Sequence, residues 1–143
     1  MHGIRRAGDG YRVGLHENER ALLRELCGEL EELLRAGAAP GRLFPSAYRD
    51  DEEAAAEYER LVRPGLEEGK LAALRTLAAT AEAPRLDEET AQTWLRALND
   101  LRLVLGTRLD VREDDSALRL REPGYAVYAW LSWLEGELIE AVS

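Results

Sequence analysis

The sequence is poor in the residues from which redox and metal centres are usually built. It has one cysteine, Cys27, and two histidines, His2 and His16. A single thiol cannot form an intramolecular disulfide, which fits a reducing compartment. The two histidines stand far apart along the chain, with no cysteine or carboxylate at ligand spacing, so we expect no zinc site.

Long apolar runs are also missing. No such run follows the basic Arg5 and Arg6, and no window approaches the roughly 20 apolar residues that a membrane-spanning helix requires. We therefore expect a cytoplasmic protein that does not act on a membrane.

Motifs for nucleotide binding and covalent catalysis are absent as well. The stretch "GDGYRVG", residues 8–14, lacks the Lys-Ser/Thr pair of a phosphate-binding loop and the strand-to-helix context of a dinucleotide site. No serine has a histidine nearby in the sequence. The carboxylates cluster at predicted helix starts and on solvated helix faces, where shifted pKa values are not expected. We expect neither an enzyme nor a bound cofactor.

Negative charge dominates what is present. The chain has 28 Asp and Glu against 19 Lys and Arg, a net charge of −9. Because sequence-independent binding of nucleic acid depends on neutralising phosphates with basic side chains, we do not expect direct binding of nucleic acid. A protein partner with a cationic surface is electrostatically favoured.

The pattern of apolar residues predicts a mainly α-helical single domain over residues 1–143. With 45% hydrophobic residues, a chain of this length is able to bury a core. Residues 1–15 are predicted to form a short β-hairpin, because Gly8, Asp9 and Gly10 are turn residues between short runs. Residues 16–143 are predicted to form a bundle of about four to five helices.

Caps, glycines and prolines predict where the helices begin and end. The predicted helices cover about 16–36, 51–62, 64–81, 88–109 and 124–142. Asp50 or Asp51 would cap the second helix, with Glu53 completing a capping box, and Asp87 would cap the fourth.

Two connections carry further predictions. We expect a kink or break at Arg63-Pro64, because the residue before a proline avoids the helical region. In the loop-like stretch "VREDDSALRLREPG", Leu118 and Leu120 would be placed to add a short strand to the hairpin.

Polar residues in the fourth predicted helix form the first candidate site. At helical spacing its apolar residues make one core stripe, consisting of Trp94, Ala97, Leu98, Leu101, Val104, Leu105 and Leu109. Asn99, Arg102 and Arg108 lie on or beside this stripe. Asp100 lies off it and is expected to be exposed and paired with Arg96, four residues earlier.

Arg102 and Arg108 have no acid three or four residues away, so their partners must come from elsewhere. We interpret them as a salt-bridge brace to the acid-rich start of the second helix, at Asp50 and Asp51. The alternatives for these two arginines are a binding site for an anion or a partner between the helices, and a solvated surface. Gly106, in mid-helix, costs about 1 kcal/mol relative to alanine, which indicates that another element packs closely against it.

The final helix supplies the second candidate site, the aromatic residues Tyr125, Trp130 and Trp133. Trp133 and Tyr125 lie off its core stripe and need another surface to cover them. Trp and Tyr are enriched at protein interfaces, so a partner or a homodimer contact is one interpretation, and packing among helices is the other.

Cys27 shares the apolar face of the first predicted helix and is expected to be a small buried hydrophobe. As a redox site it would be limited to an intermolecular bridge or a small-molecule adduct. Nearby glutamates disfavour the thiolate that such chemistry needs.

Three stretches, "LFPSAYRDD", "WLRALNDLRLVLGTRLDV" and "YAVYAWLSWLEGELIEAV", resemble an actinobacterial family of unknown function, DUF2017. The resemblance covers almost the whole chain, and "ALNDLRLVLGTRL" is its most specific part. It implies a transcriptional regulator linked to oxidative stress and sulfur metabolism, encoded beside the adaptor of the Clp protease.

We therefore expect a non-enzymatic regulatory protein that acts by protein contact, in transcription or stress response. RNA polymerase, a sigma factor or the Clp adaptor is the expected partner. The alternatives are a direct DNA-binding transcriptional regulator and an accessory protein of Clp-dependent proteolysis. No helix-turn-helix is visible in the sequence, which disfavours direct reading of DNA.

Overall fold

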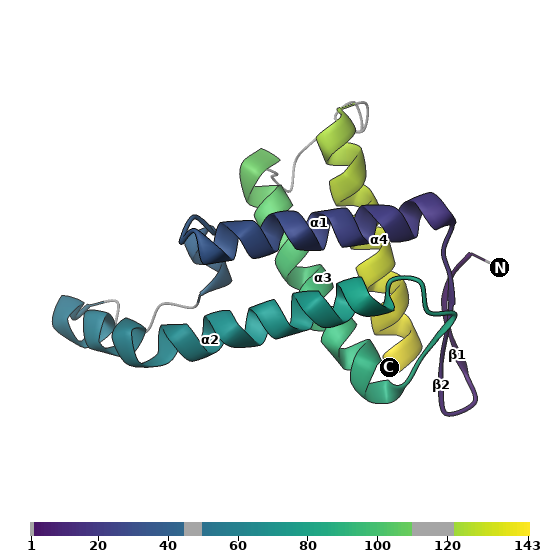
Figure 1. The fold of residues 1–143 in the computed structure, drawn as a ribbon, viewed down its shortest axis with the longest axis horizontal. Coiled ribbons are helices and arrows are strands. Elements are labelled where there is room, and N and C mark those ends of the chain that lie inside the picture. Colours follow the sequence, from purple (N-terminus) through teal and green to yellow (C-terminus); the bar gives the residue numbers. More distant parts are fainter. Residues whose placement is uncertain (1, 45–49, 110–121) are drawn as a thin grey trace.

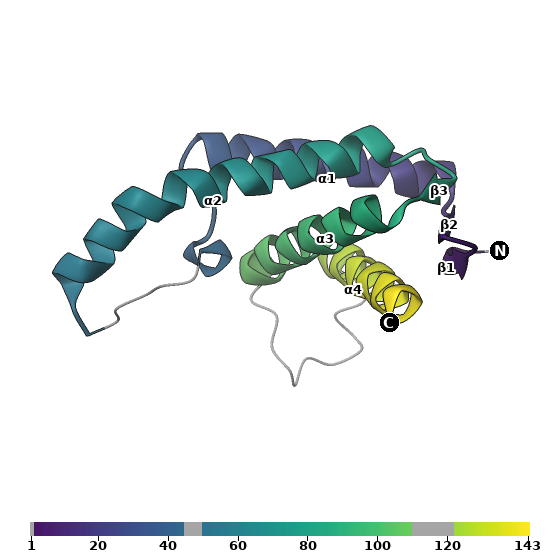
Figure 2. The same cartoon turned by 90° about the horizontal axis from the view of Figure 1, so that it is seen from below.

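The helices form two crossed layers, with a small β-sheet at one end (Figures 1 and 2). The computed structural model describes residues 2–44, 50–109 and 122–143. Four α-helices are present in these ranges: α1 (Glu17–Arg35), α2 (Glu52–Thr80), α3 (Glu88–Leu109) and α4 (Pro123–Val142). Helices α1 and α2 lie side by side and antiparallel in one layer, and α3 and α4 cross beneath them. The predicted mainly helical fold is confirmed.

The predicted N-terminal hairpin is also confirmed. Strands β1 (Gly3–Ala7) and β2 (Gly10–Gly14) pair antiparallel, and Gly8 adopts a φ of 65° at the turn, which a glycine accepts without strain. A third strand, β3 (Arg85–Leu86), pairs with β2 and was not predicted. The predicted strand at Leu118 and Leu120 lies outside the described residues.

The helix caps largely follow the sequence. His16 is the N-cap of α1, and the helix ends at Arg35, one residue before the predicted end. The side chain of Asp51, rather than Asp50, caps α2 by accepting the N–H of Ala54 at 3.0 Å. Asp87 accepts the N–H of Thr90 at 2.7 Å before the first turn of α3. These contacts satisfy backbone donors that a helix start leaves free.

A kink or break was predicted at Arg63-Pro64, and the break is wrong, because α2 continues through the proline. Pro64 is exposed, so solvent is able to satisfy the carbonyl that its missing N–H leaves free. Arg63 pairs with Glu59 at 3.3 Å and with Glu67 at 3.1 Å, four residues to either side, which stabilises the helix across this turn. The second and third predicted helices are therefore one.

The two halves of α2 differ in burial. Its buried residues, Ala73, Leu74 and Leu77, all lie in the C-terminal half. The N-terminal half projects beyond the other elements (Figures 1 and 2). Below it, a 3-10 helix, η1 (Gly41–Leu43), leads to the buried Phe44.

The core lies between the two layers and extends under the sheet. Trp94 of α3 is fully buried, and its indole N–H donates to Thr80 Oγ1 of α2 at 2.7 Å. The same core contains apolar side chains from every layer, among them Ile4, Tyr11, Val13, Leu23, Leu77, Leu86, Leu98, Leu131, Leu134 and Leu138. Burial of such side chains stabilises each of them by about 1.5–3 kcal/mol.

Arg20, in the first turn of α1, connects the sheet to the start of α1 and to the segment after α2. Its guanidinium donates to the carbonyl oxygens of Leu15 at 3.1 Å and Val13 at 2.8 Å. It also donates to those of Ala81 and Ala83, each at 2.9 Å. One side chain therefore holds the end of the hairpin and the end of α2 against the start of α1.

The substitution Arg20→Lys is expected to lower the free energy of unfolding by about 2–4 kcal/mol. An ammonium has fewer donors and no planar fork, and hydrogen bonds to charged groups contribute about 1.5–3 kcal/mol each. Arg24→Lys is the matched control, since Arg24 pairs with the exposed Glu82 and should change stability by less than about 1 kcal/mol. Urea unfolding followed by circular dichroism measures both, and equal losses would contradict the role of Arg20.

Candidate functional site

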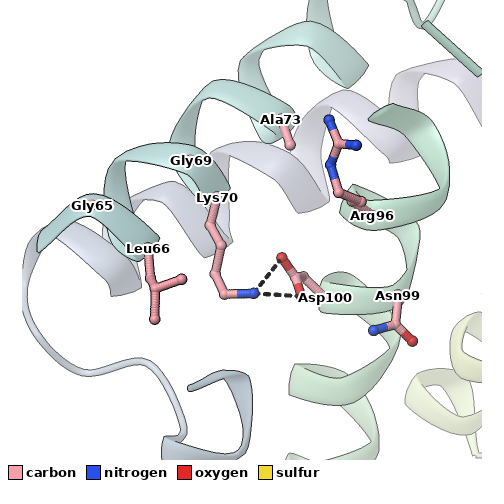
Figure 3. Close-up of a pocket in the computed structure, with 8 residues that line it drawn as sticks. All are labelled: Gly65, Leu66, Gly69, Lys70, Ala73, Arg96, Asn99 and Asp100. Carbon is pink, nitrogen blue, oxygen red and sulfur yellow. Dashed lines mark hydrogen bonds and ion pairs between the residues drawn. The ribbon is translucent and has the colours of Figure 1, made fainter. Parts of the chain in front are cut away.

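A cleft of about 410 Å³ lies between α2 and α3 (Figure 3). Lys70 of α2 and Asp100 of α3 point toward one another within it, and Lys70 Nζ donates to both carboxylate oxygens at 3.1 and 3.2 Å. Arg96 and Asn99 line the same cleft from α3. The α2 side consists of Gly65, Leu66, Gly69 and Ala73.

The expectation that Asp100 is exposed and paired with Arg96 is wrong. Asp100 is only 6% exposed, because α2 covers this side of α3, and its ion pair is with Lys70. Burial raises the pKa of Asp100 above its ordinary value, and the Lys70 ammonium offsets part of that rise. Lys70 is the only lysine of the chain, and it serves this buried carboxylate.

The chemistry of the cleft is that of a neutralised ion pair with one further cation. Its eight described lining residues include no serine, threonine, cysteine or histidine, and its lysine and aspartate are paired with each other. Arg96 is exposed and remains able to attract an anion at the cleft. The arrangement accounts for how α2 and α3 are held in register.

The substitution Lys70→Met is expected to destabilise the protein by about 2–3 kcal/mol near neutral pH, because it leaves the Asp100 carboxylate buried and unpaired. The already raised pKa of Asp100 would rise further. The folded variant then binds a proton that the unfolded chain has lost. Its stability therefore falls as the pH rises from about 4 to 7.

Urea unfolding across this pH range measures the effect. The double variant Lys70→Met/Asp100→Leu removes both charges and should lie within about 1 kcal/mol of the wild type. A single variant as stable as the wild type at neutral pH would show that the ion pair has no structural role.

Of the two arginines predicted as site residues, only Arg102 lies at the contact between α3 and α4. Arg102 Nε lies 3.5 Å from Glu135 Oε1 of α4, so its brace runs to α4 and not to the start of α2. Arg108 is exposed at a groove between α1 and α3. Among the described residues it makes no ion pair with Asp50 or Asp51, and that predicted pairing is wrong.

Close packing at Gly106 is confirmed. A Cβ atom there would lie 3.0 Å from Cε2 of Tyr128 on α4, tighter than ordinary contact. The ring of Tyr128 lies 5.8 Å from that of Tyr125, which is half-buried. The glycine therefore allows α4 to approach α3.

The start of the chain meets α1 and α4 at a cluster of rings around one carboxylate. The ring of His2 stacks on His16 at 4.9 Å and on Trp133 at 4.8 Å between centroids. Glu19 accepts from His2 Nε2 at 2.9 Å, from the backbone N–H of His16 at 2.8 Å and from Trp130 Nε1 at 2.7 Å. Two of the three aromatic residues predicted as interaction candidates, Trp130 and Trp133, are thus brought together with both histidines, whereas Tyr125 lies against Tyr128.

The sequence analysis treated the two histidines as far apart, and this is wrong, because they stack on one another in the structure. The hairpin register Gly3↔Gly14 returns the chain so that residue 2 comes beside residue 16. The spacing His16-x-x-Glu19 across the N-cap then places a carboxylate on the same helix start. Both signals were present in the sequence and were missed.

Cys27 is confirmed as a small buried hydrophobe, 2% exposed on α1. Burial, with a smaller contribution from the charge of Glu31, raises the pKa of the Cys27 thiol to about 12. A thiol with so high a pKa carries almost no thiolate at neutral pH, which is the form that reacts.

Iodoacetamide is expected to modify Cys27 of the folded protein far more slowly than that of the urea-unfolded chain. With an unfolded pKa near 8.5, the folded thiolate fraction is lower by about three-thousandfold at neutral pH. Mass spectrometry of timed aliquots measures both rates. Comparable rates would show that the thiol is accessible and activated in the fold.

Two exposed surfaces flank the ring cluster. On the sheet, the strand registers place Arg5 opposite Arg12 and Arg12 opposite Arg85, an exposed arginine row. On α4, helical spacing puts an outer face, defined by Trp133, Gly136, Ile139 and Glu140, within about 120° of the helix circumference. Trp133 is 36% exposed and Ile139 49% exposed, so much of this face is apolar.

These described residues define a helical domain with an ion-paired cleft, an arginine row and an apolar helix face. Residues 1–142 match the family described as Domain of unknown function (DUF2017), and the chain belongs to this family. No helix in the described ranges combines the length and apolar character that crossing a membrane demands.

Named relatives come from mycobacteria. Proteins called Oxidative stress regulator AosR, from Mycobacterium tuberculosis and Mycobacterium bovis, are each 31% identical to the chain over 183 aligned positions. The alignments cover 94% of this chain and 83% of each relative. No solved structure matches the chain.

Proposed function

We propose that this protein is a non-enzymatic, cytoplasmic regulator of a stress response that acts by binding another protein. The observation that carries the proposal is its similarity, over 94% of the chain, to proteins named as oxidative stress regulators. RNA polymerase or a sigma factor is the proposed partner, and the Clp adaptor is the alternative protein partner.

The outer face of α4 supports binding through protein contact. Trp133 and Ile139 are large, exposed and apolar, and Gly136 between them has no atom within 4 Å of its Cβ direction. An aromatic anchor beside an open, shallow position is typical of residues that dominate binding energy at interfaces. Glu140 is the only charged residue of this face, which limits the cost of desolvation.

The burial of Cys27 bears on how such a regulator would work. A thiol that is 2% exposed, with its pKa raised to about 12, is a poor first target for an oxidant. In the proposal, the regulatory output of this chain therefore depends on its surfaces and its partner and not on oxidation of Cys27.

The arginine row favours direct DNA binding as a second candidate function. The side chains of Arg5 and Arg12 are exposed and make no hydrogen bond or ion pair within the described part of the chain. Paired basic side chains on a sheet are suited to phosphate groups. The net charge of −9 opposes this candidate, so any DNA binding would be weak and steeply salt-dependent.

Affinity purification of the tagged protein from its host, with and without oxidant, tests the proposal. We expect the wild type to recover polymerase or sigma subunits, and Ile139→Ser to reduce that recovery by about tenfold or more. Leu61→Ser is the matched control, because Leu61 is 71% exposed on α2, away from the outer face of α4.

Two results would contradict the protein-contact proposal. One is equal recovery by wild type and Ile139→Ser. The other is binding of duplex DNA by the purified protein that Arg5→Ser/Arg12→Ser abolishes, which would establish the DNA-binding candidate in its place.

A further inference from the structure

We propose that His2, His16 and Glu19 form a binding site for a divalent transition-metal ion such as Zn²⁺, Ni²⁺ or Cu²⁺. One ligand atom from each residue is available, and these atoms all lie within 4.8 Å of one another. Two imidazole nitrogens and a carboxylate oxygen are ligands that these ions prefer. The inference goes beyond the proposed function and does not rest on it.

Glu19 is the preorganised member of the site. Its side chain is only 15% exposed, and its oxygens are oriented by the backbone N–H of His16 at 2.8 Å and by Trp130 Nε1 at 2.7 Å. Hydrogen bonds of this kind fix the direction of a metal-binding carboxylate. A carboxylate that already accepts N–H donors from two helices keeps its place when the ion arrives.

The two histidines are the ligands of the site whose side chains are able to move. His2 and His16 are both exposed, so their rings are able to rotate until their nitrogens lie about 2 Å from an ion. His2 Nε2 now meets Glu19 Oε1 at 2.9 Å, and the ion would take the place of the proton shared between them. Three protein ligands leave the remaining positions of the ion to water, so the site is open to exchange.

The position of the site gives the ion a structural effect. His2 precedes β1, His16 caps α1, and Glu19 is bonded to Trp130 of α4. An ion held by the three ligands would tie the start of the chain to two helices. His2 also stacks on Trp133, so binding of an ion by His2 would change the surroundings of Trp133 on the outer face of α4.

Isothermal titration of the full chain, prepared without a polyhistidine tag, with Zn²⁺ measures binding. We expect one ion per chain. His2→Gln and His16→Asn should each weaken binding by at least about tenfold, since even residues that only orient metal ligands contribute about 10- to 100-fold. Asparagine is a good N-cap, so His16→Asn removes the imidazole and keeps the cap of α1.

Two variants of the same helix turn separate ligation from charge. Glu19→Gln is expected to weaken Zn²⁺ binding as the histidine variants do. Glu17→Gln removes the same charge two residues earlier, from an exposed side chain in the first turn of α1, and should leave the affinity unchanged. Equal losses in both variants would show non-specific attraction to an acidic helix start and would overturn the site.

Tryptophan fluorescence provides an independent reporter. Cu²⁺ and Ni²⁺ quench nearby indoles, and Trp133 stacks on His2 while Trp130 bonds to Glu19. Trp133→Phe should remove much of the quenching by Ni²⁺ and leave the Zn²⁺ affinity unchanged. Wild-type binding no stronger than that of His2→Gln/His16→Asn, or quenching that persists in that double variant, would overturn the proposal.

Discussion

The guanidinium of Arg20 is the interaction on which the arrangement of the sheet and the upper helix layer depends. It donates hydrogen bonds to carbonyl oxygens at the end of the hairpin and in the segment after α2, two regions more than 60 residues apart in the sequence. Val13 N also donates to the carbonyl of Pro84 at 2.9 Å, so the same junction starts the pairing of β2 with β3. Buried carbonyl groups require donors, and here one side chain supplies several of them.

This junction also determines which surfaces the molecule presents. It holds the hairpin so that its apolar face completes the core, while its arginine row faces solvent in an otherwise acidic protein. It likewise brings residue 2 to the first turn of α1, where α4 passes. The sheet that carries the arginine row lies at one end of the fold, and α4 passes beside it (Figure 1).

Local signals predicted the fold well, and non-local packing was where prediction failed. Turn glycines and capping aspartates acted within a few residues, so the hairpin and the starts of α2 and α3 were correct. Asp100 was misplaced because a helical wheel assumes one buried face, whereas α3 is covered by α2 as well as by α4. The ring cluster joins three elements, so its local signals, the hairpin and the His16-x-x-Glu19 spacing, were missed. The close approach at Gly106 was predictable because a glycine in mid-helix is locally unfavourable.

The N-terminal half of α2, which projects beyond the other elements, is stabilised by different interactions from those of the rest of the molecule. None of its residues before Ala73 is among the buried residues of the helix, and its charged side chains pair along the helix, Arg60 with Glu57 and Arg63 with Glu59 and Glu67. Exposed pairs of this kind are screened by salt, whereas the apolar core is not. Ionic strength is therefore expected to act selectively on this half of α2: added salt weakens its exposed ion pairs while the crossed layers keep their packing.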